Sequence, residues 1–230
     1  MYGKCDGSGW IVDDDDLAHP CDCRERQLAR KRTTGVSTSI PRRYQGVSFD
    51  RPPLSDMARD RSTAPVAAMV RGFAEEIDAK LDEGTGLWLW GDVGTGKTSL
   101  AMAVSKAAVE AGRSVAIYSL PRLLARIRRT YDSADGEDSY LEFFERLASV
   151  DLLHVDDLGA EKRSDWVLEQ LYAIVDERYQ SQRSMVVTTN LPLNDLEEQV
   201  GARTVSRLVE ICGDPLPLNG EDLRYRVHPI

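Results

Sequence analysis

Short apolar runs recur along the larger, second part of the chain, each separated from the next by a longer segment of mixed polarity. The runs are Leu87–Trp90, Val115–Tyr118, Leu152–Val155, Met185–Thr188 and Pro215–Leu218. Uncharged runs of this length are typical of strands that are buried on both faces of a sheet. Because proline cannot donate a ladder hydrogen bond, we expect the last run to form an edge strand.

Segments with helical spacing lie between these runs, because their apolar residues recur at steps of three and four positions. They are Lys97–Ala111, Tyr140–Ala148, Trp166–Ser181 and Ala202–Ile211. Alternation of strands and helices predicts an α/β domain with a parallel five-stranded sheet flanked by helices. We place this domain at residues 42–230.

The beginning of the chain has a different character. Residues 1–32 contain three of the four cysteines, the acidic run Asp13–Asp16 and a basic end. Residues 33–41 are small and polar and end in proline, which predicts a linker. A length of 230 residues suits one α/β domain with such a small appendage.

Charge is segregated along the chain. The formal net charge of −9 argues against a nucleic-acid partner, but residues 24–43 hold seven Lys and Arg against one Glu. A second basic cluster consists of Arg122, Arg126, Arg128 and Arg129. The positive charge of both clusters is suited to binding phosphate groups. No apolar run is long enough to span a bilayer and no signal peptide is visible, so we expect a cytoplasmic protein that does not bind membranes.

A glycine-rich segment between the first apolar run and the first helix carries the clearest chemistry. Its residues are Gly91, Asp92, Val93, Gly94, Thr95, Gly96, Lys97, Thr98 and Ser99. In this strand–loop–helix context, backbone N–H groups and the helix N-terminus cradle phosphates. Lys97 then reaches the β- and γ-phosphate oxygens, and the Thr98 hydroxyl ligates Mg²⁺. The segment predicts binding of ATP and Mg²⁺.

Polar residues end two further apolar runs. Asp156 and Asp157 follow Leu152–Val155, at the sheet edge where open α/β sheets bind ligands. Asp156 is expected to hold Mg²⁺, and Asp157 to orient or deprotonate the attacking water. Asn190 ends another run, where it either reaches the γ-phosphate or serves as a turn residue. For the aspartates the alternative is a solvated strand end.

Together these stretches resemble the AAA+ ATPases of the initiator clade, and most closely DnaC-type helicase loaders and IstB-type transposase helpers. The resemblance covers roughly residues 42–228. It rests on GDVGTGKT, LLHVDDLG, TTN, GARTVSRL and NGEDLR. The first motif is common to many ATPases, whereas the ordered set is much more specific.

The resemblance implies a role for each matching residue. Lys97, Thr98 and Asp156 correspond to the Walker A and Walker B residues, and Asn190 to sensor 1. Arg207, with Arg203 as a companion, corresponds to the arginine finger that acts on a neighbouring subunit, and Arg224 to a terminal phosphate-sensing arginine. Asp157 stands where most AAA+ proteins have Glu, so the resemblance leaves the hydrolysis rate open.

The resemblance also implies a helical insertion at about residues 121–148, which in this clade lines a pore around single-stranded DNA. It would carry the cluster from Arg122 to Arg129, whose alternative is a basic solvent-facing surface. Most of the C-terminal helical lid is expected to be missing, so that a neighbouring subunit completes the ATP site. This predicts a homo-oligomer on ATP binding.

The N-terminal region resembles a degraded zinc module of some loaders. Cys5, His19, Cys21 and Cys23 are grouped as zinc ligands are, although Tyr2 stands where a CxxC pair would need a second cysteine. We expect a four-ligand zinc site in a region that binds the partner protein. The alternative is that the cysteines are structural only.

The favoured function is therefore ATP-dependent loading of the replicative helicase onto single-stranded DNA. One alternative is a transposase helper with the same core and a different client. Another is an ATP-gated DNA-binding switch with negligible turnover.

Overall fold

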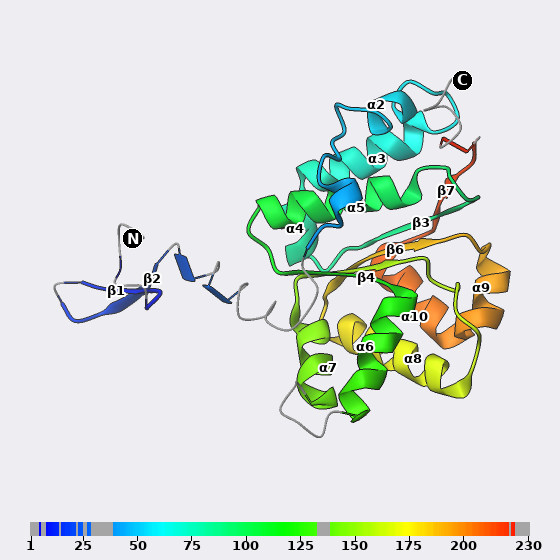
Figure 1. The fold of residues 1–230 in the computed structure, drawn as a ribbon. Coiled ribbons are helices and arrows are strands. Elements are labelled where there is room, and N and C mark those ends of the chain that lie inside the picture. Colours follow the sequence, from blue (N-terminus) through cyan, green and yellow to red (C-terminus); the bar gives the residue numbers. More distant parts are fainter. Residues whose placement is uncertain are drawn as a thin grey trace.

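The computed structural model describes residues 5, 8–13, 15–21, 23–24, 27–28, 39–132, 139–220 and 222–223. These residues form a small N-terminal β-hairpin and a layered α/β domain (Figure 1). Residues 33–38 of the expected linker lie outside the described ranges, so the boundaries of the N-terminal region remain a prediction. Within those ranges, no helix is long and apolar enough to cross a membrane.

Five parallel strands form the central sheet, in the order β4-β5-β6-β3-β7. They are β3 (Leu87–Gly91), β4 (Val115–Ser119), β5 (Leu152–Asp156), β6 (Ser184–Thr189) and β7 (Leu216–Leu218). All five predicted runs become strands, and β7, which contains Pro217, lies at the edge beside β3. The predicted parallel five-stranded sheet is confirmed.

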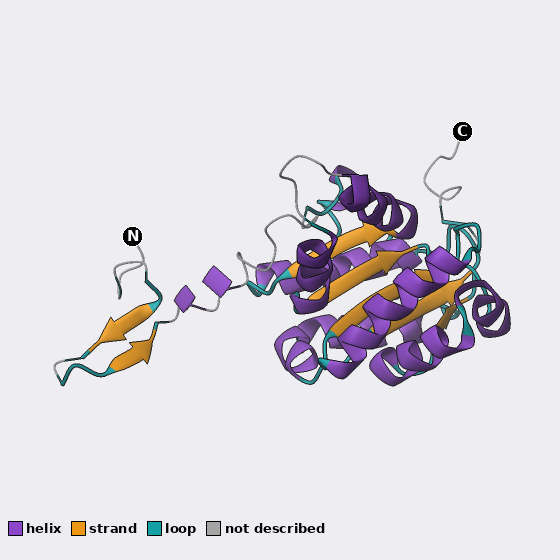
Figure 2. Ribbon diagram, turned by 90° about the horizontal axis from the view of Figure 1, so that it is seen from below, coloured by secondary structure: helices purple, strands orange, loops and turns teal. Residues whose placement is uncertain are grey.

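Helices cover both faces of this sheet (Figure 2). One layer contains α2 (Leu54–Met57), α3 (Ala64–Glu75), α4 (Ile77–Asp82) and α5 (Lys97–Glu110). The other contains α6 (Leu120–Asp132), α7 (Tyr140–Ser149), α8 (Asp165–Gln180), α9 (Leu193–Val200) and α10 (Ala202–Cys212). A short 3-10 helix, η1 (Arg42–Tyr44), precedes the first layer.

Side-chain alternation along the strands builds two separate cores. On β4, Val115 and Ile117 join the core under α2–α5, whereas Ala116 and Tyr118 join the core under α6–α10. This follows from the two-residue period of a strand, which sends successive side chains to opposite faces. The strands are apolar throughout because each face has a helical layer to pack against.

The helical insertion between β4 and β5 consists of α6 and α7. The apolar side of α6 is buried through Leu123, Leu124 and Ile127. At the start of α7, the Ser139 side chain accepts a hydrogen bond from the Glu142 backbone, and the Glu142 carboxylate accepts one from the Ser139 backbone. This reciprocal cap satisfies two otherwise free N–H groups.

A fully buried arginine on α8 fixes the end of this insertion. The Arg178 guanidinium donates to the carbonyls of Leu147, Val150 and Ser184, at 2.7, 3.1 and 2.5 Å. It thereby joins the C-terminus of α7 to the segments that begin β5 and β6. Burial lowers the pKa of Arg178 to about 9, because the low-dielectric interior disfavours the charged form.

The N-terminal hairpin pairs β1 (Trp10–Val12) with β2 (Ala18–Pro20) in antiparallel register. Most of its large apolar side chains are exposed, with Val12 62% and Leu17 60% accessible, and Ile11 is half-buried. Cys21 and Cys23, just after β2, are each only 5% accessible. Among the described residues of this region, the buried side chains are therefore those of cysteines and do not form an apolar core.

Candidate nucleotide site

The glycine-rich loop joins β3 to α5 and is tightly packed. Gly94 and Gly96 have φ values of +84° and +97°, which side chains other than glycine rarely adopt. A Cβ on Gly94 would overlap the Asp222 carboxylate, and one on Gly96 would lie 2.6 Å from Met57 Sδ. Leu223 N–H also donates to the Gly94 carbonyl at 3.0 Å. The segment after β7 therefore lies against the loop.

Lys97 opens α5 and its ammonium lies at the loop. The side chain is 5% exposed, and Nζ donates to the carbonyls of Gly91 and Asp92 at 2.8 and 2.7 Å. Thr95 Oγ1 donates to the same Asp92 carbonyl at 2.9 Å. The loop therefore holds a cation next to backbone N–H groups at a helix N-terminus, which is an arrangement suited to phosphate.

Thr98 and Asp156 meet at the edge of the sheet, although they are far apart in the sequence. Thr98 Oγ1 donates to Asp156 Oδ1 at 3.0 Å, and Thr188 Oγ1 donates to the same oxygen at 2.7 Å. Thr188 joins this contact because its strand, β6, lies between β3 and β5. Thr188 was not singled out from the sequence, and only the strand order identifies it as a partner of Asp156.

The two remaining polar residues lie at the same edge. Asp157 has a positive φ of 59°, and its N–H donates to Thr188 Oγ1 at 3.0 Å. This left-handed conformation turns the chain away from the strand directly after Asp156. Asn190 follows β6 and is exposed.

The residues present fit a magnesium nucleotide. The Thr98 hydroxyl and the Asp156 carboxylate offer two hard oxygen donors side by side, as Mg²⁺ requires. The loop glycines leave room for close backbone approach to phosphate. Beside Thr95, a pocket of about 190 Å³ is lined by Asp56, Met57, Asp60, Ser62, Thr63, Gly220 and Leu223.

Comparison with known families agrees with this geometry. The family described as "IstB-like ATP binding protein" matches residues 79–227, which is more than half of the chain. The chain belongs to this family.

Curated relatives of this IstB-like protein have two kinds of name. The "Replicative helicase loader DnaC" of Escherichia coli K12 is 27% identical over 186 residues, which cover 80% of this chain and 72% of DnaC. A "Putative insertion sequence ATP-binding protein y4pL" of Sinorhizobium fredii is 32% identical over 149 residues, or 63% of this chain and 58% of y4pL. An uncharacterized Escherichia coli protein, YdaV, is 30% identical over 60% of this chain and 54% of its own length. The chain thus spans little more than half of YdaV and y4pL.

Solved structures share the fold. The crystal structure of the DnaC helicase loader has a TM-score of 0.66 and 27% identity, covering 78% of this chain and 100% of that one. The replication initiator DnaA bound to AMPPCP and single-stranded DNA has a TM-score of 0.62 at 20% identity, covering 76% of this chain and 52% of DnaA. The sheet and its flanking helices are therefore those of AAA+ P-loop proteins.

Arg207 of this IstB-like protein is held within its own chain. Its Nε lies 3.1 Å from Asp176 and its Nη1 lies 3.0 Å from Glu210, while the guanidinium carbon lies 4.2 Å from the centre of the Tyr179 ring. Hydrogen bonding to Asp176 raises the pKa of Arg207 above its ordinary value. Arg203, its expected companion, is exposed.

The arginines of α6 differ in their exposure and in their aromatic contacts. Arg122, Arg128 and Arg129 are exposed, and Arg126 is half-buried. The guanidinium of Arg128 lies 4.6 Å above the ring of Trp166, and that of Arg126 lies 5.6 Å from the ring of Phe143. The buried apolar side of the helix therefore leaves Arg122, Arg128 and Arg129 as its exposed cationic positions, and the guanidinium of Arg128 lies against an aromatic ring.

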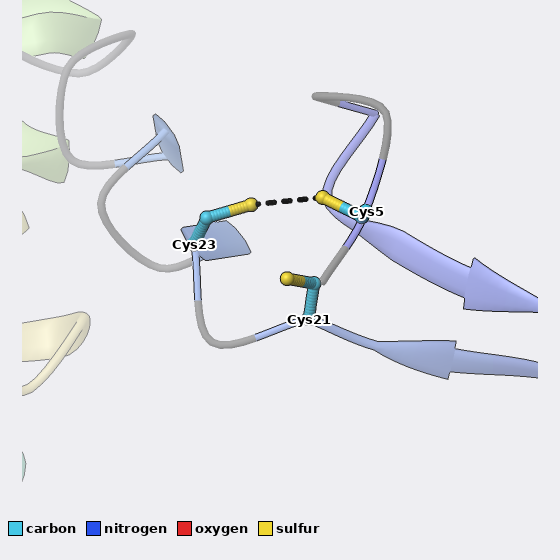
Figure 3. A group of neighbouring side chains, drawn as sticks. All are labelled: Cys5, Cys21 and Cys23. Atoms are coloured by element: carbon cyan, nitrogen blue, oxygen red, sulfur yellow. Dashed lines mark hydrogen bonds between the residues drawn. The ribbon is translucent and has the colours of Figure 1, made fainter. Parts of the chain in front are cut away.

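Three of the four expected zinc ligands converge in the N-terminal region (Figure 3). The sulfurs of Cys5, Cys21 and Cys23 all lie within 4.8 Å of one another, with Cys5 and Cys23 only 3.3 Å apart. His19 is not part of this group. Its Nε2 instead contacts the Asp13 carboxylate, and both of these side chains are exposed.

Arg224, the expected phosphate-sensing arginine, lies outside the described residues.

Proposed function

We propose that this protein is an ATP-dependent loader of a replicative helicase onto single-stranded DNA. One observation carries the proposal: the chain combines a magnesium-nucleotide edge at Lys97, Thr98 and Asp156 with an arginine-bearing helical pair inserted between β4 and β5. The similarity to DnaC, which extends over most of this chain, supports the same function.

In the proposed reaction each residue at the sheet edge has one task. Lys97 binds the β- and γ-phosphates, and Thr98 with Asp156 holds Mg²⁺, which when bound neutralises phosphate charge. Asp157 accepts a proton from the water that attacks the γ-phosphate, and Asn190 orients that water. Arg207 of a neighbouring subunit stabilises the developing charge, so that ATP binding assembles the oligomer.

Loading is tested with the full chain and the replicative helicase of the same organism. On circular single-stranded DNA, which offers no free ends, we expect ATP-dependent capture of the helicase followed by unwinding of an annealed strand. The Lys97→Ala chain should give neither. If the wild-type chain does not associate with the helicase at any nucleotide state, the loader proposal is wrong.

The transposase-helper alternative has its own support, namely the family description and the relative named as an insertion-sequence protein. Such a protein would stimulate strand transfer by a transposase and would not co-purify with the helicase.

The switch alternative depends on the shorter carboxylate at Asp157. It requires DNA binding that differs between ATP and ADP without measurable turnover, even with DNA and partner present.

We also propose that the insertion binds the phosphates of single-stranded DNA through Arg122, Arg128 and Arg129, the exposed arginines of α6. Arginines that bind phosphates act through counterion release and do not read sequence. Changing all three residues to Ala should weaken binding to all sequences alike. It should also flatten the plot of log affinity against log salt by roughly 0.7 for each phosphate that is no longer neutralised. ATP binding should stay unchanged. Unaltered DNA affinity would exclude these residues.

Finally, we propose that Cys5, Cys21 and Cys23 bind one Zn²⁺ and that the module they form contacts the client protein. Three convergent thiols supply the soft ligands that zinc prefers. The described part of the module has no apolar core of its own to explain their burial. His19 is not assigned as the fourth ligand.

A further inference from the structure

We propose that Asp176 and Glu210 are positioning residues that hold Arg207 ready to act on the nucleotide of a neighbouring copy of this chain. The inference rests on the proposed function, which makes Arg207 the residue that completes a neighbour's ATP site. It adds the residues on two helices that set the orientation of this arginine.

Three contacts fix the guanidinium from different sides. Asp176 on α8 binds Nε, Glu210 one turn further along α10 binds Nη1, and the Tyr179 ring lies beneath. Within the described part of the chain, Nη2 makes no hydrogen bond. The guanidinium is therefore anchored through two of its three nitrogens, and the third, Nη2, is left to bind a ligand.

Burial makes these contacts more than an ordinary surface ion pair. The side chains of Arg207 and Asp176 are only 33% and 20% exposed, whereas pairs such as Arg71 and Glu75 are 46% and 64% exposed. An exposed pair contributes little because water screens it and both side chains lose rotamer freedom. Here packing between α8 and α10 shields the pair.

Pre-orientation has a direct consequence for transition-state stabilisation. A free arginine must lose rotamer entropy when it engages a phosphate, whereas an anchored one has lost it on folding. Donors that are already in place when charge develops contribute most to catalysis. Anchoring should therefore raise turnover and leave nucleotide affinity almost unchanged.

The alternative is that Asp176 and Arg207 only clasp α8 to α10. That alternative predicts a loss of thermal stability, and with it a loss of every activity of the same subunit. A positioning role predicts that only the contribution of Arg207 to ATP turnover in the neighbouring subunit is lost. The two can therefore be separated by asking which subunit of a mixed oligomer is defective.

The first experiment measures ATP turnover at concentrations where wild-type chains associate, with single-stranded DNA and helicase present. We expect Arg207→Ala to lower kcat by about tenfold or more and Asp176→Asn by roughly three- to tenfold, with KM within about twofold. Arg207→Lys should resemble Arg207→Ala because an ammonium lacks the fork. Glu177→Gln is the matched control, since this exposed neighbour on α8 does not contact Arg207, and its kcat should equal that of wild type.

The second experiment mixes each variant with Lys97→Ala chains, which cannot hydrolyse ATP themselves but carry an intact Arg207. If Asp176 acts in trans, Asp176→Asn sites should regain turnover in the mixture. A Lys97→Ala/Arg207→Ala chain should not restore it. The inference would be overturned if Asp176→Asn had the wild-type kcat, or if its turnover stayed low in the mixture. Either outcome would leave the ATPase and loader proposals intact. A wild-type chain without turnover would instead remove the ATPase proposal on which the inference rests.

Discussion

The nucleotide edge and the N-terminal cysteine cluster are both built from residues distant in the sequence, but they are held in place by different means. Thr98, Asp156 and Thr188 are fixed by three adjacent strands between two apolar cores. Cys21 and Cys23 lie beside a two-stranded hairpin whose Trp10 and Val12 are exposed. Two-stranded hairpins are marginal in water without further support. We therefore expect the nucleotide edge to be shaped before its ligand binds, and the cysteine cluster to take its shape only with the proposed zinc.

Removal of metal should have the most different effects on the stability of the two regions. In protein purified without chelator, we expect about one zinc per chain, and Cys21→Ser should abolish it. Because structural zinc contributes roughly 10 kcal/mol to small modules, the hairpin should unfold without it. The backbone amides of residues 8–24 should then lose their protection against hydrogen exchange, while the melting temperature of the ATPase domain stays unchanged.

Cys212→Ser is the matched control for this experiment. Cys212 is buried in the core of the ATPase domain, and its pKa is raised to about 12 by that burial. We expect its substitution to lower the melting temperature of the domain and to leave zinc content unaltered. Chains that contain no zinc as purified would contradict the difference drawn between the two regions.

Lys97→Ala should break only the nucleotide edge. Loss of the ammonium removes a charge-assisted contact with the phosphates, so the dissociation constant for ATP should rise by about 100-fold, measured by calorimetry. The strands that shape the edge remain, so stability without nucleotide should change little and zinc content should not change. Wild-type ATP affinity in this variant would refute the assignment of the site.

Acid should destabilise the ATPase domain through one buried histidine. Burial lowers the pKa of His154 to about 3, whereas the unfolded chain binds a proton near pH 6.5. Below that pH the unfolded state holds the extra proton, so stability is complete above about pH 6.5 and falls as the pH drops towards 3. We expect a loss of roughly 2–3 kcal/mol between pH 7 and 4.5 by urea denaturation.

The His154→Asn variant tests the source of this acid sensitivity. Asn cannot titrate but can still hydrogen-bond to Ser105, whose Oγ lies 2.8 Å from His154 Nδ1. Its unfolding free energy should therefore depend less on pH over the same range. An identical slope in both proteins would assign the acid sensitivity to other groups.

The smallest effect is expected from a contact inside the N-terminal region. The Arg24 guanidinium lies 3.7 Å from the centre of the exposed Trp10 ring. Exposed cation–π contacts contribute about 0.5–1 kcal/mol. Arg24→Gln should therefore lower zinc affinity less than about fivefold. A complete loss of zinc would show that this stacking, rather than the thiols, holds the module together.

The sequence predicted the sheet well because its strands are short uncharged runs between helices. It was less informative for α2, α3, α4 and α9, which were not among the predicted helices. Among these, α2 and α4 are only four and six residues long, too short for the periodicity of apolar residues to be clear.

Residue types alone could not predict two features of the sites. Thr188 became visible as a partner of Asp156 only through the strand order, which the sequence suggested but did not determine. His19 was grouped with the cysteines because it is near them in the chain. Its ring instead contacts the Asp13 carboxylate, which the spacing of the cysteines does not predict. The roles of Asn190, Arg207 and the α6 arginines remain predictions.

The contact between Leu223 and Gly94 makes the order of synthesis important for this protein. The phosphate loop emerges from the ribosome long before β7, yet β3 stays a bare edge with the sequence Leu-Trp-Leu-Trp until β7 pairs with it. At roughly 5–20 residues per second, the gap lasts on the order of ten seconds. Unpaired apolar edges are sites of aggregation. A nascent chain stalled before Leu216 should therefore be a substrate for chaperones, and no partial translation product should bind ATP.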